Sequence, residues 1–159
     1  PPQNADAWSN RLRYAVYEPL AVSPANRFNG LNVAPQLIVT CSNLAAGTVS
    51  PPGCPSLPVN AQITDRVAFV VYSHGANGVG ATNINDINSR RLFTAALQAT
   101  LPDELANSPN DEATVAARRS FLARERSDAQ SNSGPFDDVV VFVSAGTLAA
   151  KLAAAGVYP

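Results

Sequence analysis

The strongest apolar run in the chain is VAFVVYS at residues 67–73, and the segment HGANGVGA at residues 74–81 follows it directly. A continuous run of β-branched and aromatic residues is typical of a buried central strand. Gly75, Gly78 and Gly80 can adopt the positive φ angles that a tight strand exit needs, and Asn77 tolerates them next best. We therefore predict a central strand that runs into a tight glycine-rich turn.

Further strands are expected on both sides of this run. Residues 11–17 alternate polar and apolar side chains, which places Leu12, Tyr14 and Val16 on one face of a half-buried strand. Three runs predict additional strands: 37–40, the second half of 113–126, and 137–144. Within the second of these, the segment 120–126 is expected to pair with the strand that follows it.

Helices are expected only at the margins of the sheet. Apolar spacings of three and four predict a short helix within 84–100, and residues 102–112 have the composition of a polar loop. Ser144 or Thr147 caps a closing helix that Gly156 ends. The order of elements predicts a single α+β domain spanning 1–159, built on an antiparallel β-sheet with short peripheral helices.

Composition supports one compact domain. The chain has 159 residues, of which 46% are hydrophobic and 14% charged, and its formal net charge is −1. This balance excludes binding to nucleic acid or acidic membranes through net charge alone. The chain contains no Met and begins at Pro1, so we expect a processed or truncated chain, and any signal peptide or membrane anchor would have to lie upstream of Pro1.

Cys41 and Cys54 bracket a turn-rich segment without hydrophobic periodicity. A disulfide that closes this loop stabilises the fold by about 3 kcal/mol in the chain-entropy model. The alternatives are two separate buried thiols, or a metal site with His74, which lacks the fourth ligand of a closed structural zinc site. We predict the disulfide, and with it an oxidising compartment: the periplasm, the cell surface or the medium.

His74 invites a comparison with hydrolases because a glycine-rich turn after a buried strand can form an oxyanion hole. The chain has no Gly-x-Ser-x-Gly motif and no second histidine. Its glycines match neither the dinucleotide fingerprint nor the phosphate-binding loop. We therefore expect no enzymatic activity and no cofactor, and we expect His74 to be a strand-end residue that contacts the neighbouring loop.

Two groups of charged residues have open interpretations. The carboxylates of 102–112 and the pair Asp137 and Asp138 offer oxygen ligands for a hard cation, but neither group has calcium-loop spacing, so we expect solvated acids and assign no metal. Arginines supply ten of the eleven basic residues. If they converge they form a binding groove for DNA or another polyanion, and otherwise they pair with surface acids. The arginines considered for such a groove are Arg118, Arg119, Arg124 and Arg126.

Three blocks of the chain resemble the type IV pilin-like family, in particular minor pilins and pseudopilins. They are DAWSNRLRY at 6–14, YSHGANGVGA at 72–81 and FDDVVVFVS at 136–144. In that family an Asp-x-Trp-Gly-Asn segment begins the sheet after a long first helix. A Ser-His-Gly-x-Asn-Gly turn follows a central strand, and Phe-Asp-Asp opens the last strand. Ser9 stands where glycine is usual.

The resemblance covers the part of the family that follows its long N-terminal helix, and that helix is absent from this chain. It implies a structural subunit of a type IV pilus or of a secretion pseudopilus. The subunit is anchored in the inner membrane through the absent helix before assembly, and then displays this domain on a filament in the periplasm or at the cell surface. The partners it implies are other pilin or pseudopilin subunits. The alternative is a surface or pilus-tip module that captures DNA or another ligand through the arginines. The resemblance also implies a sheet core made of Trp8, Tyr14, Phe69, Val71, Val139, Val141 and Phe142.

Overall fold

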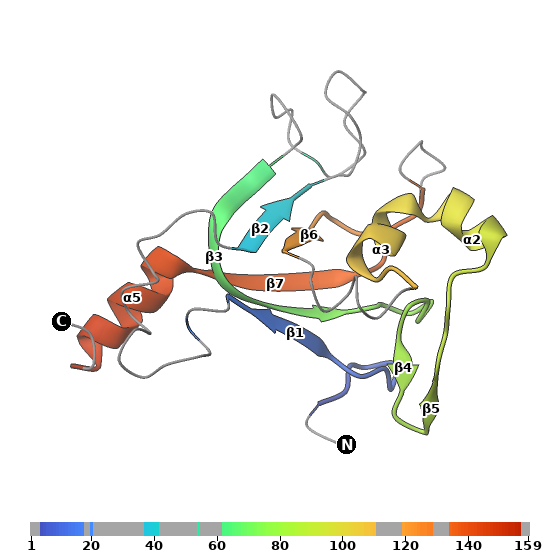
Figure 1. The fold of residues 1–159 in the computed structure, drawn as a ribbon, viewed down its shortest axis with the longest axis horizontal. Coiled ribbons are helices and arrows are strands. Elements are labelled where there is room, and N and C mark those ends of the chain that lie inside the picture. Colours follow the sequence, from blue (N-terminus) through green and yellow to red (C-terminus); the bar gives the residue numbers. More distant parts are fainter. Residues whose placement is uncertain are drawn as a thin grey trace.

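The computed structural model describes residues 4–17, 20, 37–41, 54, 62–110, 119–128 and 134–156 of the chain. Figure 1 shows the arrangement of its elements, with α5 at one end of the sheet and α2 and α3 at the other. The elements are β1 (Arg13–Val16), β2 (Leu37–Thr40), β3 (Gln62–Ser73), β4 (Thr82–Asn83), β5 (Asp86–Arg90), α2 (Ala95–Thr100), α3 (Pro102–Asn107), β6 (Ser120–Leu122), β7 (Val139–Ser144) and α5 (Ala145–Ala154).

The long strand β3 organises the sheet. Its second half pairs antiparallel with both β1 and β7, which therefore lie on opposite edges, and its first half pairs antiparallel with β2. β6 pairs with β2 in parallel, so the sheet is mixed. The α+β class is confirmed, but the expectation of an antiparallel sheet is wrong for this pair. The chain between β2 and β6 includes β3, α2 and α3, which is long enough for the crossover that a parallel pair needs.

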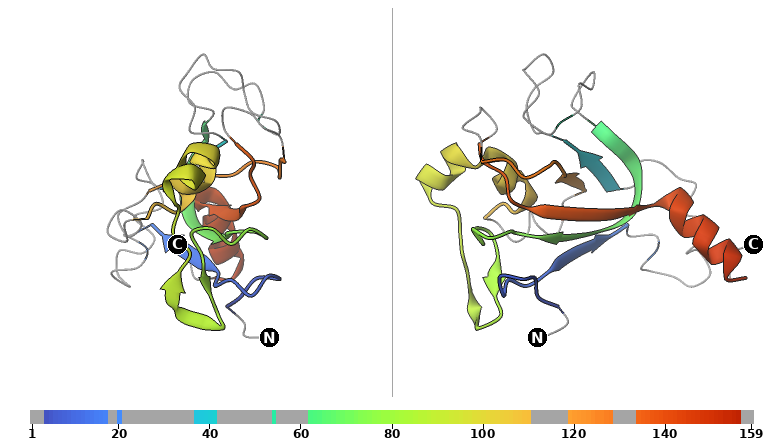
Figure 2. Two further views of the ribbon diagram at one scale, coloured as in Figure 1. Left: turned by 90° about the vertical axis from the view of Figure 1, so that its right-hand side faces the viewer. Right: turned by 180° about the vertical axis from the view of Figure 1, so that it is seen from behind.

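The sheet curls (Figure 2), and the main core is formed by buried side chains of β2, β3 and β6 together with Tyr17. Within it Tyr72 contacts Phe121 with ring centroids 5.7 Å apart, which joins β3 to β6. Both side chains are almost completely buried, and aromatic pairs of this kind contribute beyond the area they bury. The cluster comprises Tyr17, Leu37, Val39, Val67, Val70, Tyr72 and Phe121.

The residues expected to form the sheet core lie mostly on the opposite face. Trp8 is 45% exposed, Tyr14 78%, Val139 49% and Val141 61%. Val70 and Tyr72 point into the core, so the alternation of β3 turns Val71 outward, together with the residues paired to it, Tyr14 and Val141. In a continuous apolar run the sequence does not show which of the two alternating sets of side chains faces the core, and that is why this expectation failed.

The segment 82–110 also differs from expectation. The predicted helix over 84–100 is reduced to α2, because β4 and β5 form a hairpin in its first half. Asn83 Oδ1 accepts a hydrogen bond from the backbone N–H of Asn85, which closes the turn locally. The polar loop expected after Leu101 begins with the short helix α3, where proline occupies the first turn.

Two other expectations are confirmed. Ser144 caps α5 by accepting a hydrogen bond from Thr147 N–H, and Gly156 follows the helix with a φ of 70°. Cys41 and Cys54 form a disulfide with Cα atoms 5.6 Å apart, while the loop between them lies outside the described residues. A strand forms within 120–126, although β6 pairs with β2 and not with the following strand. Among the described helices, none has the length and apolar character needed to cross a membrane.

Candidate functional site

Three segments that are far apart in the sequence meet where β3 ends. Ser73 Oγ donates a hydrogen bond to Asp6 Oδ2 at 2.5 Å, and Asn10 Nδ2 donates to the backbone oxygen of Gly75 at 3.0 Å. On the other side, the backbone N–H of Asn77 donates to Asp137 Oδ2 at 2.9 Å. These contacts join the segments 6–10, 73–77 and 137–138, which we call the β3 exit.

The segment 6–10 forms a tight turn around one carboxylate. Asp6 Oδ1 accepts hydrogen bonds from the backbone N–H groups of Trp8, at 2.9 Å, and Asn10, at 2.8 Å. Ser9 adopts a φ of 64°, in the left-handed region that glycine occupies without strain. The turn therefore forms with serine in the position where the pilin-like family usually has glycine, at a backbone cost of order 1 kcal/mol or more.

Gly75 is required by the close approach of the last strand. Its φ is 59°, and a Cβ placed on it would lie 2.2 Å from the backbone oxygen of Asp137. Real Cβ atoms do not come so close to backbone, so any side chain at this position would push Asp137 away. The glycine of the Ser-His-Gly segment thus sets the distance between the end of β3 and the start of β7.

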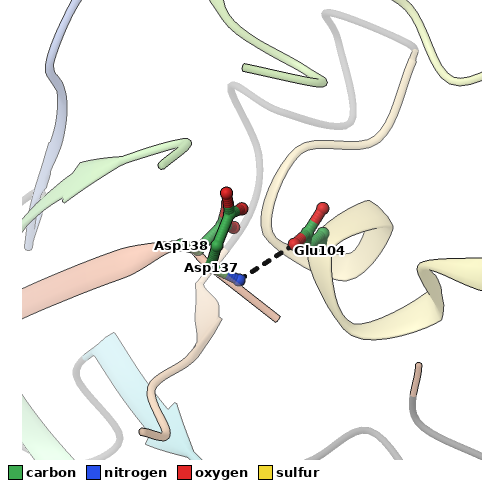
Figure 3. A group of neighbouring side chains, drawn as sticks. All are labelled: Glu104, Asp137 and Asp138. Carbon is green, nitrogen blue, oxygen red and sulfur yellow. Dashed lines mark hydrogen bonds between the residues drawn. The ribbon is translucent and has the colours of Figure 1, made fainter. Parts of the chain in front are cut away.

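Next to this contact, three carboxyl groups gather (Figure 3). Carboxylate oxygens of Glu104, Asp137 and Asp138 lie within 4.8 Å of one another. Glu104 Oε1 accepts from the backbone N–H of Asp137 at 3.0 Å, and its Oε2 accepts from Asn77 Nδ2 at 2.8 Å. Glu104 is 0% exposed and Asp138 4%, so the expectation of solvated acids is wrong for both. Asp111 and Glu112 lie outside the described residues.

Burial, and after it the nearby charge of Asp138, raise the pKa of Glu104 from 4.5 to about 8. Glu104 therefore retains a proton at neutral pH. A carboxyl group with a raised pKa can serve as a general acid, but it must also touch a substrate. Since Glu104 has no exposed surface, a substrate would reach it only after α3 moved. The geometry favours a structural role for this proton.

Asn107 and Asp138 extend the network to β6. Asn107 Nδ2 donates to Asp138 Oδ2 at 3.0 Å and to the backbone oxygen of Leu122 at 2.9 Å, while Asn107 Oδ1 accepts from the N–H of Leu122 at 2.7 Å. His74 is 0% exposed, with its ring edge-on to Tyr72 and its Nδ1 3.7 Å from Asp138 Oδ1. The sequence analysis considered the acids of 102–112, the pair Asp137 and Asp138, and His74 separately, and the fold places Glu104, Asp138 and His74 in one buried polar network.

The arginines considered for a polyanion groove have different surroundings. The side chain of Arg124 is completely buried; its Nε lies 3.2 Å from Asp103 Oδ2 and its guanidinium carbon 4.6 Å from the centre of the Phe136 ring. Burial lowers the pKa of Arg124, and Asp103 opposes that shift. Arg126 is 67% exposed and lies 3.5 Å from Asp128. Arg119 is exposed beside β6, and Arg118 lies outside the described residues.

The sheet has an apolar face that the described residues leave largely uncovered. Tyr14, Val71 and Val141 form one row of directly paired residues across β1, β3 and β7, and Val16, Phe69 and Val143 form the next. Leu148 and Leu152 of α5 pack against the cluster at the Phe69 end of this face. We call this surface the outer face; it comprises Tyr14, Val16, Phe69, Val71, Val139, Val141 and Val143.

An apolar patch that joins several strands marks an interaction site more often than scattered exposed side chains do. The sequence analysis named Tyr14, Val71, Val139 and Val141 as core residues; on this face Tyr14, Val139 and Val141 are exposed and Val71 is partly buried. Comparison with known proteins yields no match: no family model, no curated protein and no solved structure matches this chain.

Proposed function

We propose that this chain is the globular domain of a filament subunit of the type IV pilin-like class, either a minor pilin or a pseudopilin. The observation that carries the proposal is the outer face. Its rows of paired apolar residues have the character of a core surface, yet Tyr14 and Val141 are 78% and 61% exposed in this domain. A segment with a matching apolar stripe is needed to cover them.

The long helix that precedes the globular domain in the pilin-like family supplies such a segment. The segment 6–14 enters the sheet as β1, one of the three strands that build the outer face. An amphipathic helix just before this point reaches the face without a long connection. In this proposal the first part of the helix anchors the subunit in the inner membrane and the second part packs on Tyr14, Val71 and Val141.

The blocks that carry the family resemblance support the proposal in a second way. They lie at 6–14, 72–81 and 136–144, and the structure joins all three at the β3 exit through the contacts of Asp6, Gly75 and Asp137. Segments so far apart that share one junction form a structural unit. In the proposal this unit connects the covered outer face to the rest of the domain, and it performs no catalysis.

The disulfide supports placement of the domain outside the cytosol, in the periplasm or at the cell surface, because such bonds persist in oxidising compartments. The other proposed function, capture of DNA through arginines, has less support. The burial of Arg124 removes one of its four residues from the surface, while Arg126 stays accessible. Loss of salt-dependent DNA binding in Arg126→Ala would support it.

The filament proposal is tested first by the gene sequence upstream of Pro1. We expect about 20 predominantly apolar residues there, preceded by a short charged leader. A conventional cleavable signal peptide in that position would exclude the proposal. This test requires only the upstream sequence and no measurement on the globular domain.

A second test uses the subunit with its upstream segment. Val141→Asp places a charge in the centre of the outer face, where Val141 is 61% exposed, and Leu92→Asp places the same charge on a leucine that is 51% exposed and lies outside the strands. We expect Val141→Asp to abolish incorporation into filaments and Leu92→Asp to leave it intact. Both isolated domains should fold normally, since both sites are exposed there. Normal incorporation of Val141→Asp subunits would refute the proposal that the outer face is covered in the filament.

A further inference from the structure

The turn at 6–10 presents an aromatic side chain beside a polar hollow. Trp8 is 45% exposed, although its backbone is held by Asp6 and by the hydrogen bond from Ile84 N–H to Ser9 oxygen at 2.8 Å. Because the backbone on both sides of Trp8 is fixed, binding of a ligand to the indole costs little ordering of this turn. An exposed aromatic ring on a fixed turn is a preorganised contact surface.

The hollow beside Trp8 has a volume of about 450 Å³, in the usual range of small-molecule sites. The residues that line it and bear polar side chains are Asn10, Asn77, Asn83, Asp86, Arg90 and Arg91. They come from the segments 6–10 and 73–77 of the β3 exit, from the hairpin of β4 and β5, and from Arg91 directly after β5. The hydrogen bond from Ile84 N–H to the Ser9 oxygen holds the hairpin against the β3 exit, so the hollow is formed by segments that are joined to one another.

The hydrogen bonds within the lining leave a particular set of groups for a ligand. The guanidinium of Arg90 donates to the backbone oxygens of Gly80, Ser108 and Pro109, so its role is structural. Asn83 Oδ1 accepts from Asn85 N–H, and its amide nitrogen has no partner among the described residues. Arg91 is exposed, and one of its nitrogens donates to the backbone oxygen of Asn77.

The charge of this lining selects the class of ligand. Asp86, which is exposed and lines the hollow together with Arg91, opposes the binding of a polyanion, and the three asparagines disfavour a wholly apolar ligand. Amide, carboxylate and guanidinium groups are planar and can each form paired hydrogen bonds with adjacent hydroxyl groups. The face of an indole offers apolar contact to the C–H groups of a ring that also carries hydroxyls.

We propose that this hollow binds a short neutral saccharide, with one sugar ring against Trp8 and its hydroxyls bonded to Asn83 and Arg91. This proposal does not rest on the filament proposal, since the hollow uses residues of the β3 exit and the hairpin and none of the outer face. Binding requires no change in the covered surface of the sheet. It would give a displayed domain a means of contacting glycans.

The chain contains a single tryptophan, so tryptophan emission, excited selectively over that of the four tyrosines, reports on Trp8 alone. We would titrate the domain with maltotriose, cellotriose and triacetylchitotriose up to millimolar concentrations, and expect a saturable blue shift of the emission with at least one of them. Binding to that sugar, measured by calorimetry, should weaken about tenfold or more in Asn83→Ala and Trp8→Ala, since one lost hydrogen bond or stacking contact corresponds to about 1.4 kcal/mol.

Asn85→Ala is the matched control, because Asn85 is exposed beside Asn83 and contributes only its backbone N–H to it. We expect this variant to bind the sugar as the original chain does. An equal loss of sugar affinity in Asn83→Ala and Asn85→Ala would overturn the proposed saccharide site. The absence of a saturable response to all three sugars would overturn it as well. A response to oligo(dT) that disappears with added salt, without a response to sugars, would assign the hollow to nucleic acid and also refute the proposal.

Discussion

Replacing Glu104 by glutamine should remove the pH dependence of stability between about pH 4.5 and pH 8. The folded state raises the pKa of Glu104 from 4.5 to about 8, so in this window the folded chain holds a proton that the unfolded chain has released. The stability that this proton contributes is fully present below pH 4.5, decreases as pH rises, and is lost once pH passes 8. Glutamine has no proton to lose.

The magnitude follows from the size of the shift. Each pKa unit corresponds to about 1.4 kcal/mol, so the wild-type free energy of unfolding should fall by about 3 kcal/mol between pH 4.5 and pH 7 relative to the variant. At acid pH the variant should be less stable by about 1 kcal/mol, because the glutamine amide cannot accept both hydrogen bonds that Glu104 accepts from Asp137 and Asn77. The two stability curves should therefore cross, with Glu104→Gln the more stable protein at neutral and alkaline pH.

Urea denaturation followed by circular dichroism at pH 5, 6, 7, 8 and 9 measures these differences. Glu125→Gln makes the same chemical change at an exposed site and serves as the control. Its stability should follow the wild-type curve at every pH. Parallel curves for Glu104→Gln and the original chain would show that Glu104 holds no proton in the folded state and would refute the reasoning about the carboxyl cluster.

Three further predictions concern single contacts. Gly75→Ala should lower the free energy of unfolding by more than about 2 kcal/mol, since its Cβ collides with the Asp137 backbone at a positive φ, whereas Gly146→Ala, with open space around it, should not destabilise α5. Equilibrium denaturation compares the two. Arg124→Ala should cost about 3 to 5 kcal/mol because it leaves Asp103 buried without its cation, and Arg126→Ala less than about 1 kcal/mol. Reducing the Cys41–Cys54 bond should lower the melting temperature by an amount that corresponds to about 3 kcal/mol, and an unchanged temperature would show that the loop is held by other contacts.

The sequence predicted the elements with strong local signals. The run at 67–73 is a strand, the run at 137–144 is a strand from Val139 onward, Ser144 caps the closing helix, and the two cysteines are bonded. These features depend on residues that are close in sequence or on one distinctive pair. Local signals of this kind are sufficient because β-branched runs, helix caps and turn-rich cysteine loops each have few alternative structures.

The features that were missed depend on contacts between distant residues. Phe121 on β6 covers Tyr72 and so decides which side chains of β3 face the core. No local pattern in a continuous apolar run contains that information. The hairpin at 82–90 forms where isoleucine spacing favoured a helix, since Asn83 closes a turn with Asn85. The carboxyl cluster joins residues 104 and 137, and only the packing of α3 against the β3 exit brings them together.

The topology of β3 has a consequence for how the chain folds. Its partners β1 and β7 come from opposite ends of the described sequence, and the contacts at the β3 exit join residues 60 to 67 positions apart. A sheet with such distant pairings closes late, because loop-closure entropy must be overcome before the pairings form. The domain therefore cannot complete its sheet during synthesis until β7 has emerged, and until then the backbone groups of β3 that pair with β7 have no strand partner. Refolding on a timescale of milliseconds to seconds is expected for such a topology. Stopped-flow fluorescence of Trp8, which belongs to the β3 exit, would measure it directly.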